Sequence, residues 1–397
     1  MIQPGPVFLP KGFKFSAVKA GIKASGKPDL ALIVAEPTTT AAALFTKNLI
    51  VAAPVEVGRT SLARSSGRLQ AVIVNSGNAN CATGHAGIRD CRRVCGETAR
   101  FLKLRPAEVF PSSTGIIGVP LPVEKITAQL KPLISSAGAS LEHLRQFAEA
   151  ILTTDSKPKL ASVHLGSGRG AITGIAKGSG MIHPQLATTL VYLLTDVVAT
   201  PAELKTALRK SCDDSFNTIS IDGDTSTNDT VLLLASGVSG IRLRSVRKEF
   251  DRALLEVCRS LAEQIVADGE GVQHVIRLRI DRAKNRGEAL QIARTISHSL
   301  LVKTAWAGAD PNWGRILAAV GRSGVPVHPN KISIYIGNQM VCRGAVARSF
   351  DKNVAHEELS KPECRVTVRL GSGKASLEFL TTDLSAEYVR VNAEYST

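Results

Sequence analysis

The sequence predicts an α/β (α+β) sandwich in which sheets are flanked by helices. The chain has 397 residues, of which 44% are hydrophobic and 4% are aromatic, so the core must consist mainly of Ala, Val, Leu and Ile. Short apolar runs typical of buried strands alternate with longer segments typical of helices. The most apolar stretch begins at residues 190–194, which we expect to form a buried strand.

The composition argues against a membrane or secreted protein. No apolar stretch is long enough to span a bilayer, and the N-terminus lacks the apolar region of a signal peptide. Seven scattered cysteines fit reduced thiols. Cys91 and Cys95 lie one helical turn apart but lack the further ligands that zinc needs, so we expect free thiols in the core. These features predict a cytoplasmic protein.

The formal net charge of +15 allows two interpretations. Eleven basic residues between Arg242 and Arg286 are compatible with a nucleic-acid-binding surface. Acidic residues are interleaved with them, however, and Phe250 is the one aromatic residue of this stretch, which leaves no pattern for stacking bases. We therefore favour a solvated basic face, which would also attract anionic substrates.

Two polar turns follow predicted elements in the N-terminal half. Residues 30–35 and 71–74 are predicted strands, and the second runs into the turn NSGNAN at 75–80, ahead of a helix over 87–102. The next turn, SSTGIIG at 112–118, offers the Thr114 hydroxyl and the Gly115 amide. Glycine lets a ligand approach the backbone closely, so these two donors are able to form an oxyanion hole. The motif alone is weak.

Further elements are predicted along the rest of the chain. The sequence predicts helices over residues 123–133, 141–152, 200–213, 246–267 and 281–301 and from Asp310, a hairpin over 160–165 and 171–175, and strands after residue 331. Thr200-Pro201-Ala202-Glu203 is a typical helix start, with a capping Thr, Pro at the first position and Glu three residues after the cap. Asp310 and Pro311 predict the same start for the last helix.

Two acidic turns stand out in the C-terminal half. The segment DGDTSTNDT at 222–230 does not have the spacing of a calcium loop, so we expect a hydrogen-bonded turn beside an active site. Glu270 lies between two glycines, which predicts an exposed carboxylate on a turn that approaches another segment closely.

The segment KGSGMIHPQLATTL at 177–190 also allows two interpretations. The Thr188 hydroxyl is able to attack the carbonyl of Ala187, and hydrolysis of the resulting ester would leave Thr188 as a new N-terminus. Its α-amine, with a reference pKa of about 7.7–8.0, would then activate the hydroxyl as a nucleophile. The other interpretation is a glycine-rich loop that leads into a core strand. The segment alone does not decide between them.

Taken together, the motifs resemble those of the ornithine acetyltransferase family, also called glutamate N-acetyltransferase, of arginine biosynthesis. Each motif is weak alone, but their shared order along nearly the whole chain is specific. The matching segments are NSGNAN at 75–80, SSTGIIG at 112–118, TTD with PK at 153–159, KGSGMIHP with AT at 177–188, DGDTSTNDT at 222–230, DGEG at 268–271, LVKTA at 301–305, DPNWGRI at 310–316 and NAEYST at 392–397.

The resemblance implies a self-processing enzyme of the N-terminal-nucleophile type. Cleavage between Ala187 and Thr188 would give chains 1–187 and 188–397, the second with a smaller C-terminal α/β domain at roughly 272–397, assembled as a heterotetramer with two copies of each chain. Thr188 would be the nucleophile, and Thr114 and Gly115 the oxyanion hole. The implied substrate-binding residues are Thr154, Lys177, Thr188, Glu270, Asn392 and Thr397. We expect Thr114, Glu270 and Thr188 to share one pocket.

The implied reaction moves an acetyl group from N-acetylornithine to glutamate through an acetyl-threonine ester, without metal or cofactor. The sequence leaves open whether acetyl-CoA also serves as a donor, and whether the scaffold acts instead as an amidase or aminopeptidase in which water takes the acyl group. Gln185-Leu186 and Thr189 depart from the residues that the family usually has around the cut. These flanking residues bear on the rate of self-cleavage and on the substrate preference.

Overall fold

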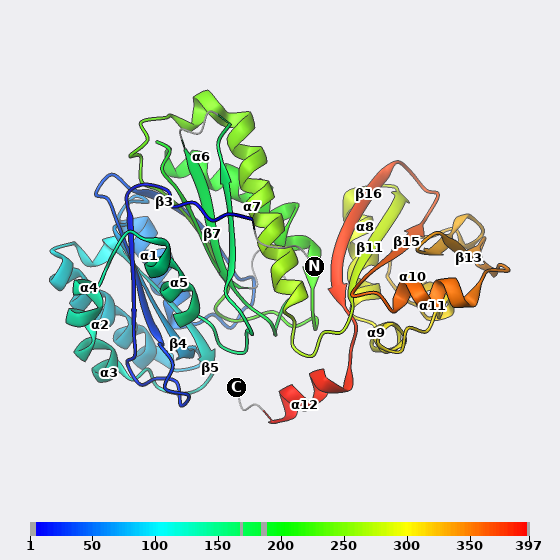
Figure 1. Cartoon of the computed structure of the whole chain (residues 1–397), viewed down its shortest axis with the longest axis horizontal. Coiled ribbons are helices and arrows are strands. Elements are labelled where there is room, and N and C mark those ends of the chain that lie inside the picture. The colour runs from blue at the N-terminus through cyan, green and yellow to red at the C-terminus, as the bar shows by residue number, and fades with distance from the viewer. Residues whose placement is uncertain (1–4, 167–169, 184–188, 395–397) are drawn as a thin grey trace.

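The computed structural model describes residues 5–166, 170–183 and 189–394 (Figure 1). Within these residues the strands form three sheets. The first sheet has the strand order β1 (Phe13–Val18), β2 (Leu30–Ala35), β4 (Ala71–Asn78) and β5 (Val109–Ile116). The second has the order β3 (Thr40–Phe45), β10 (Thr230–Ala235), β8 (Leu190–Thr195), β7 (Ala171–Lys177) and β6 (Lys159–His164). β4 and β5 are parallel, as are β8 and β10, and the other neighbours in these sheets are antiparallel.

The first two sheets pack face to face. Their shared core includes Ile33 and Val74 of the first sheet and Tyr192 and Leu232 of the second, together with Phe147 of α5 (Leu141–Ala150). The side chains of β8 alternate between this core and a second core on the outer side of its sheet. Burial on both faces explains why residues 190–194 are a continuous apolar run, and it confirms the predicted buried strand.

Helices cover the two outer faces (Figure 1). The first sheet is covered by α1 (Ala53–Arg64), α2 (Gly84–Leu102), α3 (Val123–Ala128) and α4 (Leu130–Ser135), and the second by α6 (Pro201–Asp213) and α7 (Arg247–Ala267). α6 has the predicted cap, because the Thr200 hydroxyl accepts a bond from the Glu203 amide at 3.2 Å and Glu203 accepts one from the Thr200 amide at 2.8 Å. Two sheets between helix layers confirm the predicted fold class.

The C-terminal part has its own sheet and core. The sheet has the order β14 (Val346–Ala347), β13 (Gln339–Arg343), β12 (Ser333–Ile336), β15 (Glu363–Arg369), β11 (Val275–Ala283), β16 (Ala375–Thr382) and β9 (Ile219–Ser220). It packs with α8 (Arg286–Ser297), α9 (Leu300–Ala307), α10 (Trp313–Gly321) and α11 (Lys352–Leu359). α12 (Ala386–Glu394) then leads back toward the first two sheets (Figure 1). Short 3-10 turns lie at Pro106–Glu108, Phe216–Thr218, Leu243–Val246 and Pro329–Lys331.

Several predicted elements were wrong. Residues 281–301 are not one helix, because β11 extends to Ala283 and separate helices follow it. Ile276, Leu278 and Ile280 alternate with exposed or half-buried residues, and β11 is held between β15 and β16. The cap of α10 is Asn312, not Asp310. β1 and β3 were not predicted as strands.

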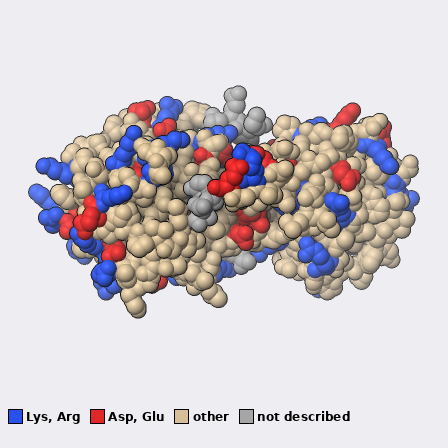
Figure 2. Space-filling model, turned by 90° about the horizontal axis from the view of Figure 1, so that it is seen from below, with Lys and Arg blue, Asp and Glu red and all other residues tan. Residues whose placement is uncertain are grey.

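The distribution of surface charge and the state of the cysteines bear on the predictions of a solvated basic face and of free thiols. On the face seen in Figure 2, basic and acidic side chains are interspersed and do not gather into one basic patch. All seven cysteines are free and buried, as predicted for Cys91 and Cys95. None of the helices in the described residues has the length and apolar character to cross a membrane.

Candidate active site

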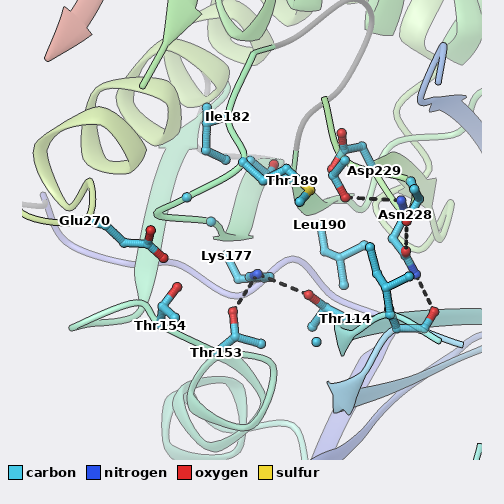
Figure 3. A pocket seen from close by; sticks show the side chains of 18 of the residues that line it. Thr114, Thr153, Thr154, Lys177, Ile182, Thr189, Leu190, Asn228, Asp229 and Glu270 are labelled. Atoms are coloured by element: carbon cyan, nitrogen blue, oxygen red, sulfur yellow. Dashed lines mark hydrogen bonds between the residues drawn. The ribbon is translucent and has the colours of Figure 1, made fainter. Parts of the chain in front are cut away.

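One pocket brings together most of the residues that the sequence singled out (Figure 3). Thr114, Gly115, Thr154, Lys177, Glu270 and Asn392 all line it. They come from β5, the loop before β6, the end of β7, the turn after α7, and α12. Ala187, Thr188 and Thr397 lie outside the described residues. Thr189, which follows Thr188 in the chain, also lines the pocket.

Lys177 fixes the direction of the Thr114 hydroxyl. The Lys177 ammonium donates to Thr114 Oγ1 at 3.1 Å and to Thr153 Oγ1 at 2.9 Å (Figure 3). An ammonium group has only donors, so Thr114 must accept this bond through a lone pair. Its own hydrogen therefore remains free to donate to a ligand oxygen in the pocket.

Gly115 occupies a position that admits only glycine. Its φ is +130°, a conformation that side chains rarely adopt. A Cβ atom there would lie 2.5 Å from the amide nitrogen of Asn78 and would overlap the carbonyl carbon of Gly77. These atoms belong to β4, which pairs with β5 at this level. The absence of a side chain lets the two strands meet at the edge of the pocket.

Glu270 lies on another wall of the pocket. It is half-buried, so the expectation of an exposed carboxylate was wrong. The Glu270 amide donates to the carbonyl oxygen of Ser179 at 2.9 Å, and Asn392 Nδ2 donates to the Glu270 carboxylate at 2.9 Å. The hydroxyls of Thr154 and Ser179 are 2.8 Å apart. α7, the end of β7 and α12 thus hold a carboxylate in place opposite Thr189 and Asp229 (Figure 3).

The turn DGDTSTNDT borders the pocket, as predicted, through its last residues. Asn228 Nδ2 donates to the carbonyl oxygens of Ala79 at 2.7 Å and Ser113 at 2.9 Å, which ties the start of β10 to the first sheet. Asp229 is buried, and its Oδ2 atom has no hydrogen-bond partner among the described residues. Burial raises the pKa of the Asp229 carboxyl well above its usual range.

Sequence reasoning gave no role to Thr153, Asp155, Asn228 or Asp229. All four belong to segments that the sequence had marked as motifs, TTD with PK and DGDTSTNDT. Membership of a motif was the available signal, but neither burial nor hydrogen-bond partners can be read from it. Among the described residues, no three His, Cys, Asp or Glu side chains gather as ligands for a metal ion.

A pocket in which hydroxyls, a cation and a carboxylate converge at the ends of strands is typical of an enzyme active site. The α/β sandwich and this pocket thus define a candidate enzyme. The chain belongs to the ArgJ family, whose model matches residues 14–397.

Two relatives are similar over nearly their whole length, and both are named arginine biosynthesis bifunctional protein ArgJ. The protein from Chlorobaculum tepidum is 42% identical over 393 residues, covering 98% of this chain and 96% of that protein. The protein from Thermus thermophilus is 43% identical over 391 residues, covering 98% of this chain and 100% of that protein. A solved structure of ArgJ from Bacillus halodurans is 36% identical with a TM-score of 0.49, and the match covers 50% of this chain and 96% of that one.

Proposed function

We propose that this chain is a glutamate N-acetyltransferase that moves the acetyl group of N2-acetyl-L-ornithine to L-glutamate in arginine biosynthesis. Membership of the ArgJ family supports the reaction class. The observation that carries the proposal is the convergence of Thr114, Gly115, Lys177 and Glu270 in one pocket beside Thr189, one peptide bond from Thr188. We place the reaction in the cytoplasm.

The nucleophile would be the Thr188 hydroxyl, released by self-cleavage after Ala187. The freed α-amine removes the hydroxyl proton, and Oγ1 attacks the acetyl carbonyl of acetylornithine. The tetrahedral oxyanion is stabilised by the Thr114 hydroxyl and the Gly115 amide. Loss of one such donor typically slows acyl transfer about a hundred- to a thousandfold. Ornithine leaves with the proton, and the amine of glutamate then attacks the acetyl-threonine ester.

Lys177 and Glu270 would recognise the two ends of the amino acids. Burial lowers the pKa of Lys177, and the nearby Asp155 carboxylate opposes this shift. The positive charge of Lys177 suits the α-carboxylate that ornithine and glutamate share, while Glu270 suits the side-chain ammonium of ornithine. The acetyl group travels on the enzyme, so the reaction as written requires no metal or cofactor. Acetyl-CoA is a second candidate donor for the same threonine.

The number of chains in the purified protein tests the nucleophile. The wild type should consist of residues 1–187 and 188–397, held together in a heterotetramer with two copies of each, as native mass spectrometry would show. Thr188→Ala should remain a single inactive chain, because alanine has no hydroxyl to attack the carbonyl of Ala187. Thr189→Ala is the matched control and should still be cut after Ala187. A second chain that begins at Thr189, or an uncut and fully active wild type, would contradict the proposal.

An acetyl-transfer assay tests the reaction. Purified protein is incubated with glutamate and either N-acetylornithine or acetyl-CoA, and both acetylglutamate and free acetate are measured. Acetylglutamate should form from N-acetylornithine, and formation from acetyl-CoA would make the enzyme bifunctional. Release of acetate without acetylglutamate would identify an amidase or aminopeptidase instead.

A further inference from the structure

A network of buried charges lies directly behind the pocket. Lys159 Nζ is 2.6 Å from Asp155 Oδ1 and 2.6 Å from Asp268 Oδ2. The side chains of Lys159 and Asp155 are 0% exposed and that of Asp268 is 5% exposed. Lys177 Nζ is 4.0 Å from Asp155 Oδ2. Two carboxylates and two ammonium groups thus form an electrically balanced set, in which only Lys177 reaches into the pocket.

Asp155 also accepts hydrogen bonds from two backbone amides, one next to Lys177 and one in the residue whose hydroxyl Lys177 contacts. The Gly178 amide donates to Asp155 Oδ1 at 2.5 Å, and the Thr153 amide donates to Asp155 Oδ2 at 3.2 Å. Gly178 follows Lys177, and the Thr153 hydroxyl accepts a bond from Lys177. The Asp155 carboxylate therefore holds Gly178 and the loop that carries Thr153 in place. It also stabilises the positive charge of Lys177.

We infer that Asp155 is a positioning residue that keeps Lys177 charged and directed at Thr114, so that the Thr114 hydroxyl points its hydrogen at the oxyanion. The inference rests on the proposed function. If Lys177 were neutral, its amine would have a lone pair and Thr114 would be able to donate to it, turning its hydrogen away from the ligand. The charge of Lys177 thus decides the direction in which Thr114 donates.

The surroundings of Lys177 make Asp155 the main support of this charge. Carboxyl groups of Asp155, Asp229 and Glu270 face it, and so do the ammonium groups of Lys159 and Lys23. Asp155 has the largest favourable effect on Lys177 of the three carboxyls. Burial alone would raise the pKa of Asp155, but Lys177 and Lys159 hold it at about 2, so Asp155 is ionised throughout the working range of pH.

Asp155→Asn tests the inference, with Asp268→Asn as the matched control. Both substitutions remove a buried carboxylate that lies 2.6 Å from Lys159, but only Asp155 is 4.0 Å from Lys177. In Asp155→Asn the alkaline limb of kcat/KM for acetyl transfer should move to lower pH by about one unit or more, because burial then acts on Lys177 without its main counter-ion. In Asp268→Asn the limb should stay in place.

A second measurement does not depend on catalysis. Reductive methylation with formaldehyde and cyanoborohydride modifies the neutral amine, so its rate at Lys177, followed by peptide mass spectrometry across pH, reports the protonation of that residue. The pH at which methylation of Lys177 reaches half its maximal rate should fall in Asp155→Asn by about as much as the alkaline limb of kcat/KM. It should not fall in Asp268→Asn. If that variant does not fold, Asp155→Asn with Lys159→Met keeps the buried set neutral and should give a smaller shift in the same direction.

The outcomes separate the two proposals. A wild type without acetyl transfer would reject the proposed function, while methylation would still report the effect of Asp155 on Lys177. An active wild type with unchanged pH profiles in Asp155→Asn would overturn the inference alone. Equal shifts in Asp155→Asn and Asp268→Asn would also overturn it, because they would indicate a general loosening of the network.

Discussion

Gly115 offers a sharp test of the geometry, because a single methyl group must separate two paired strands. In Gly115→Ala the new Cβ would lie 2.5 Å from the Asn78 amide nitrogen and 2.7 Å from Gly77 Cα. Ordinary contacts between such atoms begin near 3.4 Å, so β4 and β5 must move apart by about 1 Å. The parallel pairing of Gly77 with Gly115 leaves no flexible side chain to yield instead.

Two effects should lower the free energy of unfolding of Gly115→Ala. Overpacking of this kind costs about 1–3 kcal/mol. A side chain at a φ of +130° adds strain of about 1–3 kcal/mol. Gly118 is the matched control, because its φ is +82° and a Cβ there would meet nothing within 4 Å among the described residues. Gly118→Ala should therefore show the strain alone, and Gly115→Ala should be less stable than Gly118→Ala by about 1–3 kcal/mol.

Denaturant unfolding of both variants in the Thr188→Ala background, which we expect to stay one chain, measures this difference. In the processed background, a shift of the Gly115 amide by about 1 Å should slow acetyl transfer about a hundredfold. Equal stabilities for the two alanine variants would refute the argument, because they would show that the strands are not held as closely as described. Full activity of Gly115→Ala would remove its amide from the oxyanion hole.

Further predictions concern the Thr114 hydroxyl and two histidines in contact, of which His183 is buried and His298 is half-buried. Thr114→Ala should slow formation of the acetyl-enzyme roughly ten- to a thousandfold in single-turnover measurements, while Thr114→Ser should retain most of the rate, and an unchanged rate in Thr114→Ala would exclude the hydroxyl. His183 Nδ1 and His298 Nε2 are 3.0 Å apart, and burial lowers the pKa of His183 to about 3 and that of His298 to about 4. The unfolded chain binds these protons near pH 6.5, so the pair loses stability as the pH falls from about 6.5 toward 4. His298→Asn should reduce the drop in Tm between pH 7 and pH 5, and an undiminished drop would contradict this assignment.

The sequence by itself determined those features that depend on neighbours along the chain. The cap of α6 needs only Thr200, Pro201 and Glu203, and the strand at residues 190–194 is marked by an unbroken apolar run. The order of the motifs also indicated the family and named Thr114, Gly115, Lys177 and Glu270 as site residues before their positions were known. That these residues share one pocket followed from the resemblance and not from their spacing.

Only the tertiary structure decided the features that depend on partners far away in the sequence. Residues 281–283 were predicted as the start of a helix, and they belong to the strand β11 because β15 and β16 supply its hydrogen bonds. Gly115 must be glycine because the backbone of Gly77 and Asn78 occupies the space of a side chain. Asp155 was only one residue of the TTD motif until its contacts with Lys159 and Lys177 placed it in a buried network. Burial, hydrogen-bond partners and charge balance arise from contacts between distant segments, so they are fixed only when the chain has folded.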